Sequence, residues 1–202
     1  MNDKPKYNPQ IHHRRSIRLK GYDYSQAGLY FITICCTRRG NPLRLPFGHI
    51  ENDEMILNEM GNIAYNEWAK LPERFPNFEL DVFQIMPNHM HGIINVRTGF
   101  TPAQNDVRAG FTPAQNNGPN GQHNNGQPQG IAPTVGDIIG AYKSLVANAC
   151  LEIFKSKNEM MGKLWQRNYY EHIIRNEQSY QTISNYIINN PAKWSEDKFY
   201  CK

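Results

Sequence analysis

Apolar residues follow two different periods along this chain, and these periods mark the expected strands and helices. The longest near-continuous apolar run covers residues 29–37 and predicts a central β-strand buried on both faces. Residues 78–82 alternate apolar and polar positions, as a half-buried strand does, and this strand runs on to a corner at Pro87 and Asn88. A third strand at 89–96 is rich in β-branched residues and is expected to lie beside its predecessor.

Helical spacing of apolar residues appears in three segments. The predicted helices cover residues 52–71, 134–157 and 176–190. Asn52 or Asp53 is expected to cap the first helix, and Pro72 is expected to end it. Thr134 caps the second helix, and Pro191 ends the third.

Two segments show no hydrophobic periodicity. Residues 1–20 form a basic arm, and residues 97–132 form a low-complexity insert in which a run of about ten residues is nearly duplicated. Neither segment can bury enough apolar surface to offset the entropy lost on ordering. We therefore expect one domain over residues 1–202, with an extended arm and a flexible insert. Residues 164–175 are aromatic and basic, and they predict either a last strand or an irregular segment.

Composition narrows the class of protein. Hydrophobic residues make up 39% of 202 residues, which allows a real core. No run approaches the about 20 apolar residues of a membrane helix, and the first ten residues lack the apolar region of a signal peptide. We therefore expect a cytoplasmic protein without a membrane partner. The four cysteines have no zinc-binding spacing, which favours reduced thiols.

The charge balance is mildly basic. A net charge of +4 is weak support for a nucleic-acid partner, but six of the 22 Lys and Arg residues lie within the first twenty positions. Such an arm suits a phosphate backbone, and it equally suits a solvated tail.

Two histidines carry the candidate chemistry. His89 and His91 are two residues apart on a predicted strand, so both project from one face and can reach one divalent ion. The common alternative is a pair of surface histidines. On the last predicted helix, Tyr186 and Asn190 share a face. The Asn190 carboxamide oxygen can complete a site for Mg²⁺ or Mn²⁺, and the Tyr186 hydroxyl can then attack a polarised phosphate.

Other tyrosines offer weaker surroundings. Tyr180 is followed one turn later by a serine, Tyr169 is followed three residues later by His172, and Tyr170 is followed one turn later by an apolar residue. A core aromatic is the commoner role for a residue placed as Tyr186 is. A phenol with a pKa near about 10 also needs a base before it can act as a nucleophile.

Several motifs in fixed order resemble a known family. The segments that carry the resemblance are Pro-Asn-His-Met-His-Gly at 87–92, Trp-Gln-Arg at 165–167, Glu-His-Ile-Ile-Arg at 171–175, Tyr-Ile-Ile-Asn-Asn-Pro at 186–191, and the chain from 14–19 through the strand at 30–33. The first resembles the His-hydrophobic-His signature of HUH single-strand endonucleases. Together they resemble the REP-associated tyrosine transposases over nearly the whole chain except the insert.

The resemblance implies an α/β (α+β) ferredoxin-like fold, with helices packed on a central antiparallel sheet and the tyrosine on a C-terminal helix. It implies metal ligands at His89, His91 and Asn190, with Mg²⁺ or Mn²⁺ as the cofactor and Tyr186 as the nucleophile. Related enzymes use Gln where this chain has Asn190, and both side chains offer a carboxamide oxygen. The implied reaction cleaves and rejoins single-stranded DNA at hairpin repeats through a 5′-phosphotyrosine.

Contacts to DNA are expected from cationic and aromatic side chains, because single strands bind in basic grooves with stacking platforms. The candidates are Arg14, Arg15, Arg18, Lys143, Arg167, Tyr169, His172 and Arg175, with Tyr170 as a further stacking residue. Insertion-sequence relatives work as homodimers and the repeat-associated group can act as monomers, so a homodimer stays open. Two other functions also stay open: a hairpin-binding protein without transposition, and a metal-dependent phosphoesterase, against which the lack of nearby carboxylates counts.

Overall fold

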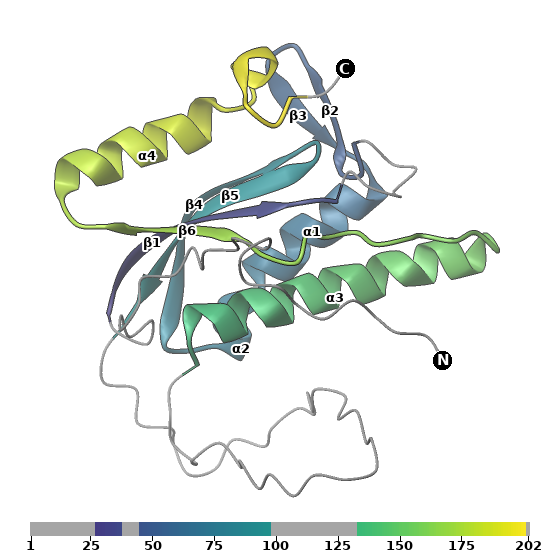
Figure 1. The fold of residues 1–202 in the computed structure, drawn as a ribbon, viewed down its shortest axis with the longest axis horizontal. Coiled ribbons are helices and arrows are strands. Elements are labelled where there is room, and N and C mark those ends of the chain that lie inside the picture. The colour runs from purple at the N-terminus through teal and green to yellow at the C-terminus, as the bar shows by residue number, and fades with distance from the viewer. Residues whose placement is uncertain (1–26, 38–44, 98–132, 201–202) are drawn as a thin grey trace, which may run out of the picture.

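A four-stranded antiparallel sheet forms the centre of the molecule (Figure 1). The computed structural model describes residues 27–37, 45–97 and 133–200. Its elements are β1 (Gly28–Cys35), β2 (Gly48–Glu51), β3 (Glu54–Leu57), α1 (Glu59–Ala69), α2 (Leu71–Arg74), β4 (Phe78–Met86), β5 (His89–Val96), α3 (Val135–Ser156), β6 (Tyr170–Ile174), α4 (Glu177–Asn189) and the short 3₁₀ helix η1 (Trp194–Glu196). Among the described residues, no helix is long and apolar enough to cross a bilayer.

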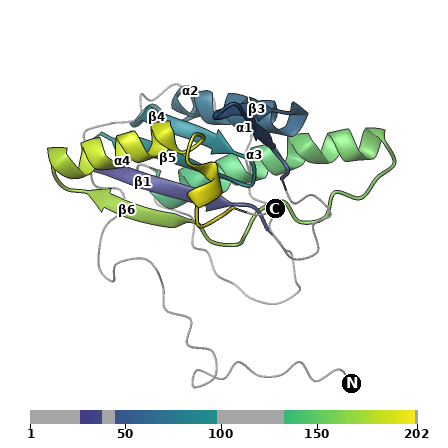
Figure 2. The same cartoon turned by 90° about the horizontal axis from the view of Figure 1, so that it is seen from above.

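The strand order is β4-β5-β1-β6, and every neighbouring pair is antiparallel. Together with α1 and α3, these strands follow the sequence β-α-β-β-α-β of a ferredoxin-like fold. Helices α1 and α3 cover one face of the sheet, and α4 lies across the other (Figures 1 and 2). The predicted fold class is confirmed, and β1 occupies the internal position that its continuous apolar run indicated.

The sheet is apolar on both faces. On the α1 and α3 side, Ile32 and Met90 belong to a large buried core that includes Trp68. On the α4 side, a smaller cluster holds Ile93 and Ile187. Because β1 and β5 supply residues to both clusters, their side chains leave little room for polar groups except at one end of the sheet.

Gly92 sets the distance between β5 and α1. A Cβ placed on Gly92 would lie 2.9 Å from the Trp68 ring and 3.2 Å from the Cβ of Phe83. The close packing of Trp68 against β5 therefore requires glycine at this position. Since neighbouring residues on a strand face opposite ways, the same register turns His91 toward the α4 side.

The first predicted helix begins too early. Residues 52–57 form the turn and second strand of the β2–β3 hairpin, and Asn58 caps α1 by accepting a hydrogen bond from the amide of Gly61. Asn52 and Asp53 have positive φ angles of 50° and 65°, the conformation of a tight hairpin turn, in which these residue types are favoured. Pro72 does not end a helix but stands in the first turn of α2.

The other two predicted helices are confirmed. Thr134 and Asp137 form a reciprocal capping box at the start of α3, and Asn176 caps α4. The segment at 164–175 is irregular at first and then becomes strand β6. The basic arm at 1–20 and nearly all of the 97–132 insert lie outside the described residues.

Candidate metal and tyrosine site

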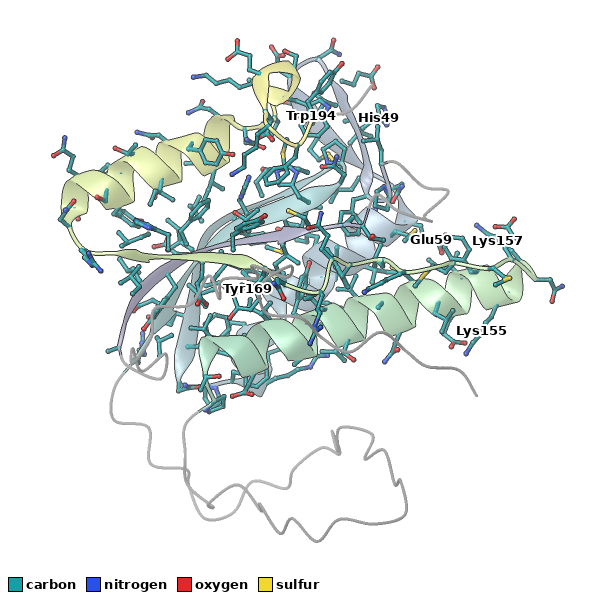
Figure 3. All side chains as sticks on the ribbon, viewed as in Figure 1. His49, Glu59, Lys155, Lys157, Tyr169 and Trp194 are labelled. Atoms are coloured by element: carbon teal, nitrogen blue, oxygen red, sulfur yellow. The ribbon has the colours of Figure 1, made fainter. Side chains whose placement is uncertain are left out.

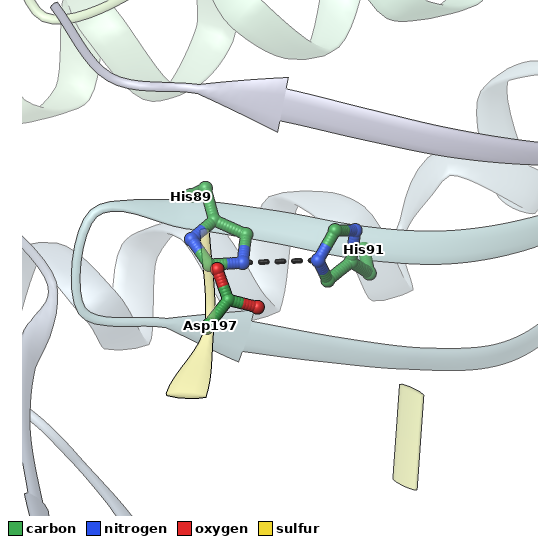
Figure 4. A group of neighbouring side chains, drawn as sticks. All are labelled: His89, His91 and Asp197. Carbon is green, nitrogen blue, oxygen red and sulfur yellow. Dashed lines mark hydrogen bonds between the residues drawn. The ribbon is translucent and has the colours of Figure 1, made fainter. Parts of the chain in front are cut away.

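His89 and His91 lie side by side at the start of β5, on the α4 side of the sheet (Figure 4). Both side chains are fully buried, and their Nε2 atoms are 3.0 Å apart. Two ligand atoms at right angles around one ion, each bonded at about 2.1 Å, are about 3.0 Å apart. This spacing fits two neighbouring ligands of one octahedral ion. The two residues are called the histidine pair below.

The outer nitrogens of the histidine pair are held by neighbouring side chains. The Asn88 amide nitrogen donates to the Phe199 carbonyl (2.8 Å), which turns the Asn88 oxygen toward His89 Nδ1 (2.9 Å). His89 Nδ1 must then carry the proton, so its Nε2 presents a lone pair. On His91, Nδ1 lies 2.8 Å from the Thr33 hydroxyl. Both Nε2 atoms can thus be ligands at once.

Helix α4 brings the tyrosine to the same place. The Tyr186 hydroxyl lies 3.1 Å from His91 Nε2 and donates to Asp197 Oδ2 at 3.1 Å. One turn later, the Asn190 amide donates to the same carboxylate oxygen at 2.8 Å. The Asn190 carbonyl oxygen is buried and has no hydrogen-bond partner. A buried acceptor without a donor is costly, and a cation would satisfy it.

The four residues that the sequence places in one site therefore lie together. Two of the competing tyrosines do not join them: the Tyr180 hydroxyl donates to Asp81 at 3.2 Å, and Tyr169 packs against the core on the other side of the sheet. Figure 3 shows Tyr169 beside α3, whereas Trp194 lies across the sheet from it.

Asp197 is a member of the site that sequence reasoning missed. It follows η1, and its carboxylate and the histidine pair form a group whose ligand atoms all lie within 4.8 Å of one another (Figure 4). The segment after Pro191 has no hydrophobic period that predicts a fold for it. The sequence feature that could have pointed to Asp197 is a carboxylate shortly after the helix that carries Tyr186, with the aromatic residues Trp194 and Phe199 on either side of it.

Burial sets the protonation of the site. Burial, followed by the neighbouring His89, holds the pKa of His91 well below its usual value, so its imidazole is neutral and able to bind a cation. Burial and the Asp197 carboxylate raise the pKa of Tyr186. The phenol therefore keeps its proton until a positive charge offsets Asp197. The donor set of two imidazoles, one carboxylate and one free carboxamide oxygen fits a divalent ion.

The C-terminal tail, residues 191–200, covers the histidine pair. The ring of Phe199 lies 4.6 Å from that of His89, and the ring of Trp194 lies 6.0 Å from it. The Phe199 carbonyl also accepts from Asn88. Because the histidine pair has no exposed surface, side chains of this tail must shift before a phosphate can reach it.

The predicted DNA-contact residues divide between the two sides of the sheet. Lys143 on α3 donates to the carbonyls of Gln166 (2.7 Å) and Arg167 (3.1 Å), and burial, with Lys163 next, lowers its pKa. Two of its three donors thus fasten the irregular segment to α3. Tyr169 packs against the same core. The prediction that these two residues bind DNA receives no support from their surroundings.

Three further candidates are exposed. Arg167 and Arg175 flank β6 with solvent-exposed side chains. His172 is also exposed, and in the register of β1 and β6 it lies opposite Phe31, which packs on the α4 side. His172 thus shares a face with the histidine pair. Arg14, Arg15 and Arg18 lie outside the described residues.

Comparisons with known proteins show what this chain is similar to. No known family model matches the sequence. An uncharacterized protein of Haemophilus influenzae is 42% identical over 196 residues, covering 96% of this chain and 97% of that protein. This chain belongs to the same family as that protein. Since the identity is high over nearly the full length of both chains, the two share one fold.

A solved structure of a REP-associated tyrosine transposase bound to a REP hairpin covers 90% of this chain and 76% of its own, with a TM-score of 0.51 and 19% identity. The chain shares the fold of that transposase. A candidate transposase from Deinococcus radiodurans is 16% identical, with a TM-score of 0.41, and covers 85% of this chain and 95% of its own.

Proposed function

We propose that the protein is a metal-dependent transposase or endonuclease that cleaves and rejoins single-stranded DNA at hairpin sequences through a 5′-phosphotyrosine. The observation that carries the proposal is the position of the Tyr186 hydroxyl, 3.1 Å from His91 Nε2. A nucleophile at this distance from a metal ligand can reach a phosphate oriented by the same ion. The shared fold with a transposase bound to a REP hairpin supports the hairpin substrate.

His89, His91, the Asn190 carbonyl oxygen and Asp197 would hold a Mg²⁺ or Mn²⁺ ion. Bound there, the ion would act as a Lewis acid that polarises the scissile phosphate. The Tyr186 oxygen attacks phosphorus, and its proton passes to Asp197 Oδ2, which already accepts its hydrogen bond at 3.1 Å. The bond from phosphorus to the 3′ oxygen breaks, and that oxygen takes up a proton. A later 3′ hydroxyl reverses the step and releases the tyrosine.

This reaction requires the C-terminal tail to make room. The ring of Phe199 packs against the histidine pair at a tilted angle, so the scissile phosphate would take the place of this ring. The contacts of Phe199 include a hydrogen bond from Asn88 to its carbonyl, a hydrogen bond from its own amide to Asp197 Oδ1 (2.6 Å), and ring packing. These are contacts that substrate binding energy can replace.

A cleavage assay tests the proposal. The substrates are hairpin oligonucleotides with single-stranded flanks, labelled at either end, incubated with Mn²⁺ or Mg²⁺ or, in a parallel reaction, with EDTA in place of the metal. We expect an upstream fragment with a free 3′ hydroxyl, a downstream fragment joined to the protein through its 5′ phosphate, and neither product in EDTA. Tyr186→Phe should abolish the linked fragment, and the control Tyr180→Phe should not. Cleavage that persists in EDTA or in Tyr186→Phe would reject the mechanism.

One observation in the structure favours the alternative function of a metal-dependent phosphoesterase. The sequence argued against a metal-dependent phosphoesterase because carboxylates were missing, and the structure supplies Asp197 beside the histidine pair. Hydrolysis of a small phosphoester without cleavage of single strands would favour that alternative. A hairpin-binding protein without transposition would instead bind the hairpin and show neither activity.

A further inference from the structure

Beside the tyrosine site, the edge strand β6 presents an aromatic ring to solvent. Helix α4 packs mainly over β4 and β5, so the face of β6 next to it is less covered. Tyr170 is the first residue of β6, and 54% of it is exposed. His172 lies two residues further along the same face and is also exposed.

The register of the sheet places Tyr170 in line with the histidine pair. His91 on β5 lies opposite Thr33 on β1, and Thr33 in turn lies opposite Tyr170 on β6. Residues directly opposite each other point to the same face. With neighbouring strands about 4.8 Å apart, the Cα atoms of His91 and Tyr170 are about 10 Å apart. If the phosphate of one nucleotide lies at Tyr186, the base of the next nucleotide can therefore reach Tyr170.

The face of the Tyr170 ring is weakly occupied. The Lys198 ammonium lies 6.0 Å from the ring centroid, and it lies closer, at 4.7 Å, to the ring of Phe199. A long cation–π contact of an exposed lysine contributes little, so a base can replace it when the C-terminal tail shifts. Lys198 and His172 also provide positive or hydrogen-bonding groups for the flanking phosphates.

We propose that Tyr170 is a stacking platform for the base of a nucleotide adjacent to the scissile phosphate. The proposal rests on the proposed function, because it takes single-stranded DNA as the ligand. A nucleotide combines a base with an apolar face and a charged phosphate. The surface at Tyr170 offers an exposed ring for the base, with the Lys198 ammonium near the ring. Stacking of one base on an aromatic side chain corresponds to a loss of about 5- to 150-fold in affinity when the ring is removed.

The test uses protein carrying Tyr186→Phe, so that binding is measured without turnover. Hairpin oligonucleotides carry 2-aminopurine at one flanking position at a time, because stacking on a ring quenches its fluorescence. We expect one position to be quenched. Tyr170→Ala and Tyr170→Leu should remove the quenching and weaken binding about 5- to 150-fold. Tyr170→Phe should keep both, since the ring is retained.

A control variant removes an exposed ring elsewhere. Tyr65 on α1 is 46% exposed, and it lies on the other side of the sheet against Phe83. Tyr65→Ala should change neither quenching nor affinity. Binding and quenching at wild-type level in both Tyr170→Ala and Tyr170→Leu would overturn the proposal, as would an equal loss in Tyr65→Ala.

The two proposals fail separately. If wild-type protein cleaves DNA but the Tyr170 variants bind as wild type does, the stacking platform is wrong and the proposed function stands. If the protein does not cleave DNA but Tyr170→Leu still removes the quenching at one position, the stacking role of Tyr170 is supported and the proposed cleavage of single-stranded DNA is wrong.

Discussion

Asn88 is predicted to control metal affinity without touching the metal. Its carboxamide oxygen lies 2.9 Å from His89 Nδ1, and this contact keeps the proton on Nδ1 and the lone pair on Nε2. In Asn88→Ala, the buried His89 loses that acceptor. The proton can then move to Nε2, where it blocks the position that the ion needs.

The size of the effect follows from this contact. Loss of an outer hydrogen bond to a metal-binding histidine typically lowers metal affinity by about 10- to 100-fold. We expect a loss of that size for Mn²⁺ in Asn88→Ala. Asn88→Asp keeps an oxygen acceptor for His89 and loses only the donor to the Phe199 carbonyl. It should therefore bind Mn²⁺ at least as well as the wild type.

Titration calorimetry with Mn²⁺ on the full chain, in the absence of DNA, measures the affinity directly. Asn62→Ala is a matched control, because the exposed Asn62 amide bonds only to the Asn58 carbonyl on α1. It should leave the dissociation constant unchanged. Equal losses in Asn88→Ala and Asn88→Asp, or no loss in either, would show that Asn88 does not set the state of His89.

Three further outcomes are expected. Asn190→Ala should weaken Mn²⁺ binding in the same titration, and Asn190→Asp should restore it, because the buried acceptor at this position then returns as a carboxylate. Gly61→Ala should lower the free energy of unfolding in chemical denaturation, because its Cβ would meet the Phe47 carbonyl; in contrast, Gly140→Ala on α3 has open space and should raise it by about 0.5–1 kcal/mol. Phe199→Ala should speed the modification of the histidine pair by diethylpyrocarbonate, followed by peptide mass mapping; an unchanged rate would mean that the tail does not shield the pair.

Strands β1, β4 and β5 and helices α3 and α4 were predictable because each carries a single clear period over many residues. The β2–β3 hairpin was not, because Met55 and Ile56 fit both a strand and the start of a helix. The decisive signal was local: Asn52 and Asp53 favour the positive φ angles of a hairpin turn, and Asn58 is the better helix cap.

The candidate site was predictable where spacing alone decides which side chains meet. Two residues on a strand fix the histidine pair, and four on a helix fix Tyr186 and Asn190 on one face. Asp197 was not predictable, because its position depends on how Trp194 and Phe199 pack back on the sheet rather than on any local period. Such tertiary contacts leave no pattern in the sequence.

Composition alone does not show which of the cationic and aromatic side chains are available to contact DNA. Lys143 is cationic, but its ammonium is engaged with backbone carbonyls on the far side of the sheet. Tyr169 directly precedes the edge strand β6 and packs against the core on the α1 and α3 side, whereas Tyr170 begins that strand and lies on the face of the histidine pair. Strand alternation could have separated the two before the structure was known.

The central claim is that Tyr186 becomes covalently joined to DNA. The most direct measurement is mass mapping of peptides from wild-type protein incubated with hairpin single-stranded DNA and Mn²⁺, then denatured and digested. We predict a nucleotide 5′-phosphate attached to the peptide that contains Tyr186, formed only with the metal present. An adduct on a different residue, or cleaved DNA with no adduct at all, would contradict it.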